Sequence, residues 1–231
     1  MSPIPALTRR LVALVGAVVA AVALALAAAP AASAVPGHDD VSTVQPLYGG
    51  MTMTGTGGSS CVTGYNVHSG STYYIVVSGQ CAEAGTDWSI GGVHVGTTVG
   101  FPSSPAYGLV SVDTANWQPQ GAILVGGAVH PITGPGQPVV GGSVCSADQR
   151  TGVHCGTVTG LNVSVSFPEG TINGLAQTNM CMEAGSGGAP VYSGSAAEGI
   201  LLGGSGNCSS GGQSFFMPIA DILSETGMGL V

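Results

Sequence analysis

Short runs of β-branched and aromatic residues, separated by glycine, serine and proline, recur along most of this chain. Examples are the segments 65–68, 73–78, 109–112, 158–167 and 200–202. Runs of this length and composition are typical of strands, and their close spacing favours a sandwich or a barrel. The 40 glycines show no fixed period, which argues against a fibrous repeat. Only one segment, which begins directly after Pro218 and ends at residue 225, has a helical pattern.

The first 34 residues have the pattern of a secretory signal peptide. Arg9 and Arg10 precede an apolar run over residues 11–29, and the small-residue motif Ala-Ser-Ala follows at 32–34. The run approaches membrane-spanning length, but the small residues and the lack of a basic stop-transfer flank favour cleavage. The arginine pair fits export by either the general or the twin-arginine route. We therefore predict a secreted, extracellular protein whose mature chain starts near residue 35 and is not bound to a membrane.

Charge and cysteine content narrow the classes of partner. In the predicted mature chain Arg150 is the only Lys or Arg against eleven acidic residues, a formal net charge of about −10. We therefore expect no binding to nucleic acid or anionic membranes. All six cysteines follow the signal peptide, which indicates an oxidising compartment and up to three disulfides in any of fifteen pairings. No Cys-x-x-Cys pair is present and the five histidines are scattered, so we expect no metal and no cofactor.

A glycine-rich stretch near the C-terminus gives the chain its clearest family resemblance. It reads Cys181-Met182-Glu183-Ala184-Gly185-Ser186-Gly187-Gly188-Ala189-Pro190, and Gly203-Gly204-Ser205-Gly206-Asn207-Cys208 follows. These motifs resemble the loop that holds the nucleophile in the chymotrypsin-like serine peptidases, most of all in their secreted streptogrisin and alpha-lytic branch. Similar segments at 61–67, 88–91, 155–162 and 177–179 extend the resemblance over residues 47–231.

The resemblance implies a fold and a domain layout. It implies an all-β protein of two six-stranded antiparallel β-barrels packed face to face, with a short C-terminal helix. The barrels would span roughly 47–125 and 126–231, after a short disordered lead-in at 35–46. We expect a monomer. The resemblance also implies three disulfides, which pair Cys61 with Cys81, Cys145 with Cys155, and Cys181 with Cys208.

Peptide hydrolysis on this fold requires a serine nucleophile, a histidine base and an aspartate that orients the histidine. The histidine normally precedes the second cysteine of the first disulfide, and that residue is Gln80 here. The aspartate normally precedes Tyr-Gly in a segment beginning Phe-Pro, and the matching residue in 101–108 is Ala106. Counted without a gap along the glycine-rich loop, the serine position is Gly187. All three positions that carry the chemistry are therefore predicted to be substituted.

Other residues are weaker candidates for the same roles. A one-residue slip of the register would make Ser186 the nucleophile, but it would still lack a base and an orienting acid. A glutamine amide has no usable basicity near neutral pH. Asp113 is predicted to be an exposed acid in a turn. The remaining candidate bases are predicted to be strand or surface histidines: His68, His94, His130 and His154.

The parts of the family's site that need no catalytic side chain are retained. By resemblance, the backbone N–H groups of Gly185 and Gly187 form the oxyanion hole, and Leu202, Gly203 and Gly204 form a strand edge that binds a substrate backbone. The main hypothesis is a secreted, catalytically inactive peptidase homologue that binds an extended peptide or protein segment without cutting it. One alternative is a serine endopeptidase with residual or unconventional activity through the serine of the slipped register. The other is an extracellular structural scaffold with no ligand in the cleft.

Overall fold

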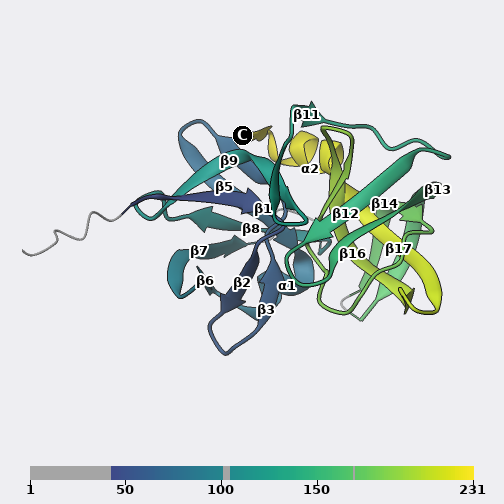
Figure 1. The fold of residues 1–231 in the computed structure, drawn as a ribbon, viewed down its shortest axis with the longest axis horizontal. Helices are drawn as coiled ribbons and strands as arrows, with labels where there is room; N and C mark the ends of the chain where they lie inside the picture. The colour runs from purple at the N-terminus through teal and green to yellow at the C-terminus, as the bar shows by residue number, and fades with distance from the viewer. Residues whose placement is uncertain (1–42, 101–104, 169) are drawn as a thin grey trace, which may run out of the picture. The chain divides into compact units, whose positions relative to one another are not determined.

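The computed structural model describes residues 43–100, 105–168 and 170–231. The predicted signal peptide and most of the lead-in lie outside these residues. The first strand, β1 (Gln45–Gly49), already includes the last two residues of the expected lead-in, so that part is not disordered. Strands dominate the described chain, and the predicted all-β fold of two barrels is confirmed (Figure 1). None of the helices in the described ranges is long and apolar enough to span a membrane.

The first barrel is built on an eight-stranded sheet in which neighbouring strands run antiparallel. Its core contains side chains that are fully or almost fully buried, including Ile75, Val77, Trp88 and Val110. Gly91 and Gly92 connect two of its strands with positive φ values of 59° and 84°, the backbone that a tight hairpin requires. In spatial order the strands are β18 (Gly229–Leu230), β4 (Asn66–Ser69), β5 (Thr72–Ser78), β8 (Tyr107–Val112), β7 (Val93–Gly100), β6 (Asp87–Ile90), β2 (Thr52–Gly55) and β3 (Ser60–Val62).

A separate three-stranded sheet lies near the expected boundary between the barrels. In it β9 (Trp117–Val125) pairs in parallel with β1 and antiparallel with β10 (Ala128–Pro131). Residues 125 and 126, on either side of the expected boundary, lie in the β9–β10 hairpin, whose turn contains Gly126 and Gly127. The C-terminal strand β18 also pairs with β4, so the first sheet has eight strands where the prediction had six, and its last strand comes from the far end of the chain.

The second barrel closes as the prediction expected. Six of its strands form a ring, because β16 pairs with β15 on one side and with β17 on the other; β11 adds to β16 in parallel. In chain order the strands are β11 (Gly134–Pro135), β12 (Ser143–Asp148), β13 (Gly152–Phe167), β14 (Gly170–Thr178), β15 (Pro190–Ser193), β16 (Ala196–Asn207) and β17 (Gly211–Pro218). Figure 1 shows these green and yellow strands beside the purple and blue strands of the first sheet.

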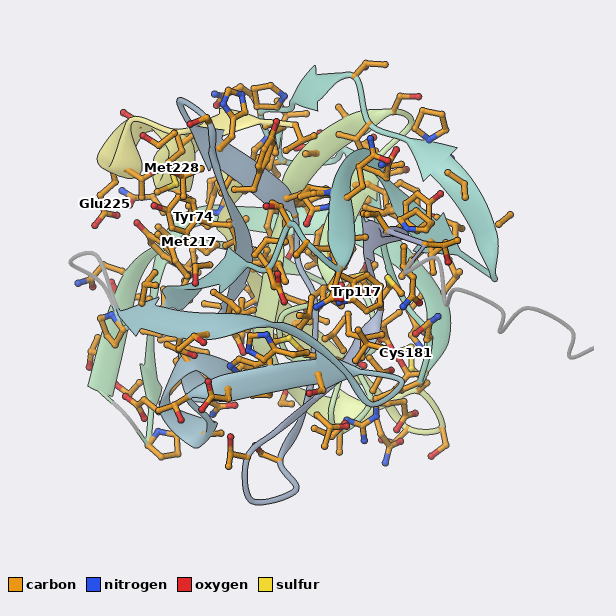
Figure 2. The ribbon with its side chains drawn as sticks, turned by 90° about the vertical axis from the view of Figure 1, so that its left-hand side faces the viewer. Tyr74, Trp117, Cys181, Met217, Glu225 and Met228 are labelled. Atoms are coloured by element: carbon orange, nitrogen blue, oxygen red, sulfur yellow. A yellow bond between two sulfur atoms is a disulfide. The ribbon has the colours of Figure 1, made fainter. Side chains whose placement is uncertain are left out.

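Two helices interrupt the strands of the described residues. The predicted C-terminal helix is α2 (Ile219–Thr226), which begins directly after Pro218 and ends where the N–H of Gly227 bonds to the carbonyl of Leu223. Figure 2 shows Tyr74, Met217 and Met228 in the region below this helix, where they belong to one hydrophobic cluster. The other helix, α1 (Gly79–Ala84), was not predicted, because six residues are too few to show a helical period.

Three disulfides and a shared core hold the described chain together. The predicted pairings Cys61–Cys81, Cys145–Cys155 and Cys181–Cys208 are confirmed. The largest hydrophobic cluster takes residues from both sheets, and the buried hydroxyl of Tyr65 donates a hydrogen bond of 2.6 Å to the carbonyl of Val191 in β15. The two barrels therefore share a core, and the loops between them are fixed in place.

Candidate functional site

The segments predicted to hold the site meet in one cleft. It consists of adjoining hollows that share Gln80 and Leu202 as lining residues. Gln80 comes from α1 and Leu202 from β16, so one wall belongs to each barrel. We call the hollow of about 230 Å³ that also reaches Gly185 and Gly187 the central hollow. The neighbouring hollow of about 370 Å³, between the glycine-rich loop and β16, is called the outer hollow.

The two residues that the sequence analysis matched to the catalytic histidine and aspartate lie next to each other. Gln80 is exposed on α1, and the adjacent Cys81 anchors that helix to Cys61. Ala106 is buried and lines a small recess of the cleft together with Gln80. The N–H of Gly79 donates a hydrogen bond of 2.9 Å to the carbonyl of Ala106, which fixes the spacing between the two segments. The Phe-Pro start of the aspartate motif, residues 101–102, lies outside the described residues.

The glycine-rich loop presents two backbone donors. Gly185 lines both hollows and Gly187 lines the central hollow. The neighbouring N–H groups of Ser186, Gly188 and Ala189 donate to carbonyls within the protein. No acceptor in the described part of the chain takes the N–H of Gly185 or Gly187. These are the two donors that the sequence analysis assigned to an oxyanion hole.

Ser186 lies beneath the loop rather than in the cleft. Its side chain is 1% exposed and its hydroxyl is 2.8 Å from that of Thr151. Thr151 gives its own proton to the carboxylate of Asp148 at 2.6 Å, so Ser186 is the donor of the pair. Ser186 does not line the hollows described above. This burial fits the ungapped register, in which Gly187 rather than Ser186 occupies the cleft position.

Gly187 leaves room for a side chain. A Cβ built there would have the hydroxyl oxygen of Ser78 at 3.6 Å and the carbonyl oxygen of Leu202 at 3.7 Å, which are ordinary van der Waals distances. Its backbone does not require glycine, because its φ is not in the positive range. The adjacent Gly188 differs, since its φ is 90° and a Cβ there would be 2.7 Å from the carbonyl oxygen of Val62.

Ser78 is a cleft residue that the sequence analysis missed. It is 2% exposed, lines both the recess and the central hollow, and makes no hydrogen bond through its hydroxyl within the described residues. It precedes α1, yet its side chain does not cap that helix. The signal was present in the sequence, because the matching family motif Thr-Ala-Gly-His-Cys has alanine where this chain has Ser78.

Arg150 is the second residue that the sequence analysis missed. Its guanidinium donates hydrogen bonds to the carbonyl of Gly185 at 3.4 Å and to the hydroxyl of Ser60, a residue of the central hollow, at 3.3 Å. It makes no ion pair with any carboxylate of the described ranges; the ion pair found there joins His94 and Asp113. The chain's one basic side chain after the predicted signal peptide therefore lies, unpaired, beside the loop.

The predicted peptide-binding edge lines the outer hollow. Leu202, Gly203 and Gly204 all contribute to it. The register of β16 against β17 shifts between residues 201 and 203, so Leu202 is an extra residue of a bulge, and it lines each hollow of the cleft. Pairing of β16 with β15 ends at Ile200, which leaves that edge without a β15 partner at 202–204. Phe167 from β13 packs against Gly203 and forms part of the wall.

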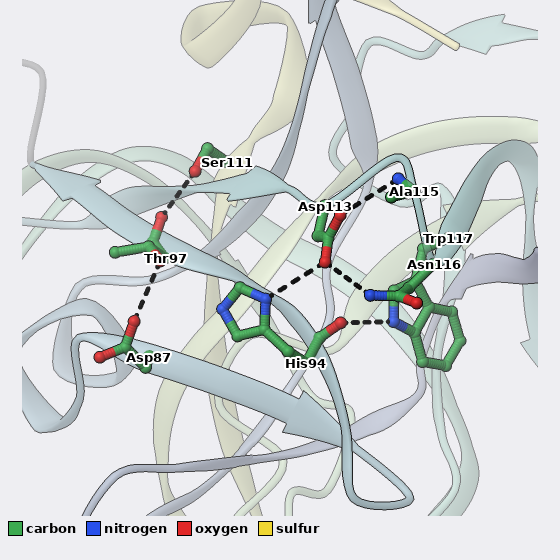
Figure 3. A network of polar contacts seen from close by, with 8 residues as sticks. All are labelled: Asp87, His94, Thr97, Ser111, Asp113, Ala115, Asn116 and Trp117. Carbon is green, nitrogen blue, oxygen red and sulfur yellow. Dashed lines mark hydrogen bonds and ion pairs between the residues drawn. The ribbon is translucent and has the colours of Figure 1, made fainter.

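The alternative acid lies outside this cleft. Figure 3 shows the carboxylate of Asp113 accepting hydrogen bonds from Asn116 at 2.7 Å, from the N–H of Ala115 at 3.1 Å and from His94 at 3.4 Å. The hydrogen bond from Asn116 contributes most to lowering the pKa of Asp113 below its ordinary value. Asp113 therefore stabilises a turn of the first barrel. The turn was predicted, but the side chain is partly buried rather than exposed.

The histidines are also placed elsewhere. His68 lies in β4 and His94 in β7, while His130 contacts the carbonyl of Gly194 at 2.7 Å. His154 packs on the Cys181–Cys208 disulfide, and these two sulfurs are not free to bind a metal because they are bonded to each other. None of the four described histidines lines a hollow that contains Gln80.

Comparisons with known proteins agree on one family. No family model matches the chain. It is 39% identical to Streptogrisin-C of Streptomyces griseus over 189 residues, and this alignment covers 80% of this chain and 41% of that protein. It is 39% identical over 175 residues to Serine protease 2 of Streptomyces fradiae, with 72% and 99% covered. Among solved structures, Protease A of Thermobifida fusca superposes with a TM-score of 0.71 at 33% identity, with 80% and 98% covered. The chain thus spans less than half of Streptogrisin-C but almost all of the other two proteins.

Proposed function

Because the chain belongs to the streptogrisin branch of the chymotrypsin-like serine peptidases, we propose that it binds an extended peptide in the family's cleft without cleaving it. The observation that supports this most directly is the lining of the central hollow. Gln80 and Gly187 contribute to it, whereas none of the described histidines does. A peptide can bind there, but its amide bond meets no histidine base, among the described residues, that could activate one of the serine hydroxyls of the hollow.

Loss of the catalytic groups would lower the rate of peptide hydrolysis by several orders of magnitude. Removing a single member of a serine triad lowers kcat by about 10⁴–10⁶-fold, and the losses are not additive because the members act as a unit. Gln80 cannot accept a proton from a nucleophile near neutral pH. Gly187 has no oxygen to attack with, and Ala106 has no carboxylate to orient a base. What remains is the background contribution of two backbone donors.

Binding requires only the features that are retained. An extended peptide can add to the edge of β16 at residues 202–204 through main-chain hydrogen bonds. The outer hollow has walls that include Phe167, Met182 and Leu202 together with Gln80 and Glu183, and it offers a pocket of mixed polarity for one of the peptide's side chains. Main-chain pairing supplies affinity and the pocket supplies selectivity, so no catalytic group is needed.

The remaining parts of the proposal follow from the cysteines and the N-terminal sequence. Three disulfides and no free cysteine in the described chain support an oxidising, extracellular location after removal of the predicted signal peptide. We propose a monomer that takes a peptide or protein segment as its partner, with no nucleic acid, membrane, metal or cofactor involved. The burial of Ser186 counts against the residual endopeptidase, and the cleft itself counts against a plain scaffold.

The test combines a hydrolysis assay with a binding assay. The purified mature protein and its Ser186→Ala variant are incubated with a broad fluorogenic peptide library, and binding of non-cleavable fluorescent peptides is measured by polarisation. We expect no cleavage by either protein and saturable binding by both. Cleavage that the substitution removes would show an enzyme and overturn the proposal. The absence of binding across the library would favour the scaffold.

Two variants at one position test whether the binding takes place in the cleft. Gly187→Leu places a bulky side chain in the central hollow, and Gly187→Ala is the matched control that adds only the Cβ for which there is room. We expect Leu to abolish binding and Ala to retain it, with melting temperatures close to that of the parent. Equal binding by both variants would place the peptide on another surface.

A further inference from the structure

We infer that the central hollow binds the free C-terminal carboxylate of a peptide rather than an internal peptide bond. This inference rests on the proposed function and names its ligand class. It starts from Ser78, whose buried hydroxyl has no hydrogen-bond partner in the described chain and is 3.6 Å from the place where a Cβ of Gly187 would stand. A buried hydroxyl without a partner is costly, and a ligand oxygen in the hollow would satisfy it.

The hollow is lined by hydrogen-bond donors that suit two oxygens. The N–H groups of Gly185 and Gly187 have no acceptor within the described residues, and Ser78 and Gln80 add a hydroxyl and an amide. A peptide carbonyl has one oxygen, which the two N–H groups suffice to bind. A carboxylate has a second oxygen and accepts up to about four hydrogen bonds, so it can use the hydroxyl and the amide as well.

Space for the second oxygen exists because residue 187 has no side-chain hydroxyl. A serine at this position would place its hydroxyl between the loop and Ser78, where the nearest atoms are 3.6 and 3.7 Å from the Cβ position. With glycine, this volume is open to the ligand. The same substitution that removes the nucleophile therefore makes room for a carboxylate.

The local charge also favours an anion. The hollow itself is lined by no acidic residue among those described, and the aspartate position is Ala106 in the adjoining recess. The acidic residue of the adjoining outer hollow is Glu183, whose carboxylate accepts a hydrogen bond from the N–H of Cys208. Arg150 is within hydrogen-bond distance of the Gly185 carbonyl and has no carboxylate partner in the described ranges. Although the whole chain has a formal charge of −8, its unpaired guanidinium stands beside this hollow. Hydrogen bonds to a charged group are about twice as strong as neutral ones.

The ligand class defines a place in a reaction sequence. A new C-terminal carboxylate arises when an endopeptidase hydrolyses a peptide bond. The N-terminal fragments that such a hydrolysis releases carry this carboxylate and belong to the inferred ligand class. The protein would bind the product of a reaction that it does not perform itself.

The test uses pairs of fluorescent peptides of identical sequence that end in a free carboxylate or in a carboxamide. Peptides selected from the library above are titrated with the mature protein, and Kd is measured for both members of each pair. We expect the acid to bind about tenfold more tightly or better, as expected for a charge-assisted hydrogen bond. Gln80→Glu, which keeps the shape and adds a negative charge, should invert this preference, and Ser78→Ala should reduce it severalfold.

The outcomes distinguish failure of the carboxylate inference from failure of the proposed peptide binding. If acid and amide bind equally, the carboxylate inference is wrong while peptide binding stands. If neither member of any pair binds, the proposed function fails and the inference fails with it. Two variants at Arg150 test the role of its charge. Arg150→Lys should retain the preference for the acid, and Arg150→Gln should lose most of it. Thermal melts of all variants show whether a loss of binding comes from loss of the fold.

Discussion

The hydroxyl of Ser186 lies 2.8 Å from the hydroxyl of Thr151, under the loop that resembles a peptidase nucleophile loop. This contact gives the serine a structural role. We predict that a serine-directed fluorophosphonate probe does not label it, and that Ser186→Ala lowers the free energy of unfolding by about 1 kcal/mol through loss of one buried hydrogen bond. Mass spectrometry and urea unfolding measure the two effects. Ser69→Ala, at an exposed site where the hydroxyl makes no hydrogen bond within the described residues, is the control for stability; a probe adduct on Ser186 would contradict the prediction.

Two neighbouring glycines should respond in opposite ways to the same substitution. Gly187→Ser should change the melting temperature by less than about 2 °C, because its Cβ fits and its φ is not positive. Gly188→Ser should destabilise the protein by roughly 2 kcal/mol or more, since its φ is 90° and the Val62 carbonyl is too close. Thermal melts compare the two directly. Gly187→Ser should also stay inactive in the hydrolysis assay, because Gln80 supplies no base.

Glu198 should make stability decrease as the pH rises. It is 6% exposed in β16, one of its carboxylate oxygens has no partner among the described atoms, and burial raises its pKa above the ordinary value of 4.5. The folded state therefore holds this proton more tightly than the unfolded state does. Its stabilising effect is complete below pH 4.5 and is lost as the pH rises through the raised pKa.

The substitution Glu198→Gln tests that dependence. We expect the variant to have a flatter stability profile between pH 4.5 and 8 than the parent, and a higher melting temperature at the alkaline end. Urea unfolding across this range measures it. Glu183→Gln is the comparison, since the Glu183 carboxylate already accepts a hydrogen bond of 2.9 Å from the N–H of Cys208. A parent profile that rises with pH over this window and is unchanged by Glu198→Gln would contradict the assignment.

Asp113 should matter for stability and not for peptide binding. Its pKa is lowered chiefly by the hydrogen bond from Asn116, so its contribution is present above its unfolded pKa and is lost as the pH falls through the lowered one. Asp113→Ala should cost about 0.5–1.5 kcal/mol at pH 7, through loss of the hydrogen bonds that form the turn. Unfolding and polarisation assays on one preparation give both values. A large change in peptide affinity would mean that the turn is coupled to the cleft.

The sequence was sufficient for the features that depend on local patterns or on a fixed motif. Pro218 predicted the start of the C-terminal helix, and the β-branched runs predicted strands such as β5 and β13. The family resemblance supplied the three disulfides and the closed second barrel. These features are determined within a few residues or by a shared motif, so one sequence is enough to find them.

The features that could not be predicted from the sequence depend on contacts between distant segments. α1 is too short to show a helical period in the sequence. The short strand β18 belongs to the first sheet only because it pairs with β4, which lies far away in the sequence. The importance of Ser78 depends on its distance from Gly187, and that of Arg150 on its hydrogen bond to Gly185. The departure of Ser78 from the alanine of the family motif marks the position but not its partners, and an arginine in a turn such as Arg150 has no distinguishing pattern until the neighbours are known.

The pairing of β18 with β4 also has a consequence for biosynthesis. Residues 66–69 are made early in synthesis, and their partner at 229–230 is made much later. The first barrel therefore cannot be completed until residue 230 has been made, and the edge of β4 stays unpaired until β18 arrives. An unpaired strand edge invites association with other chains, so the newly made protein is most prone to aggregate during this interval.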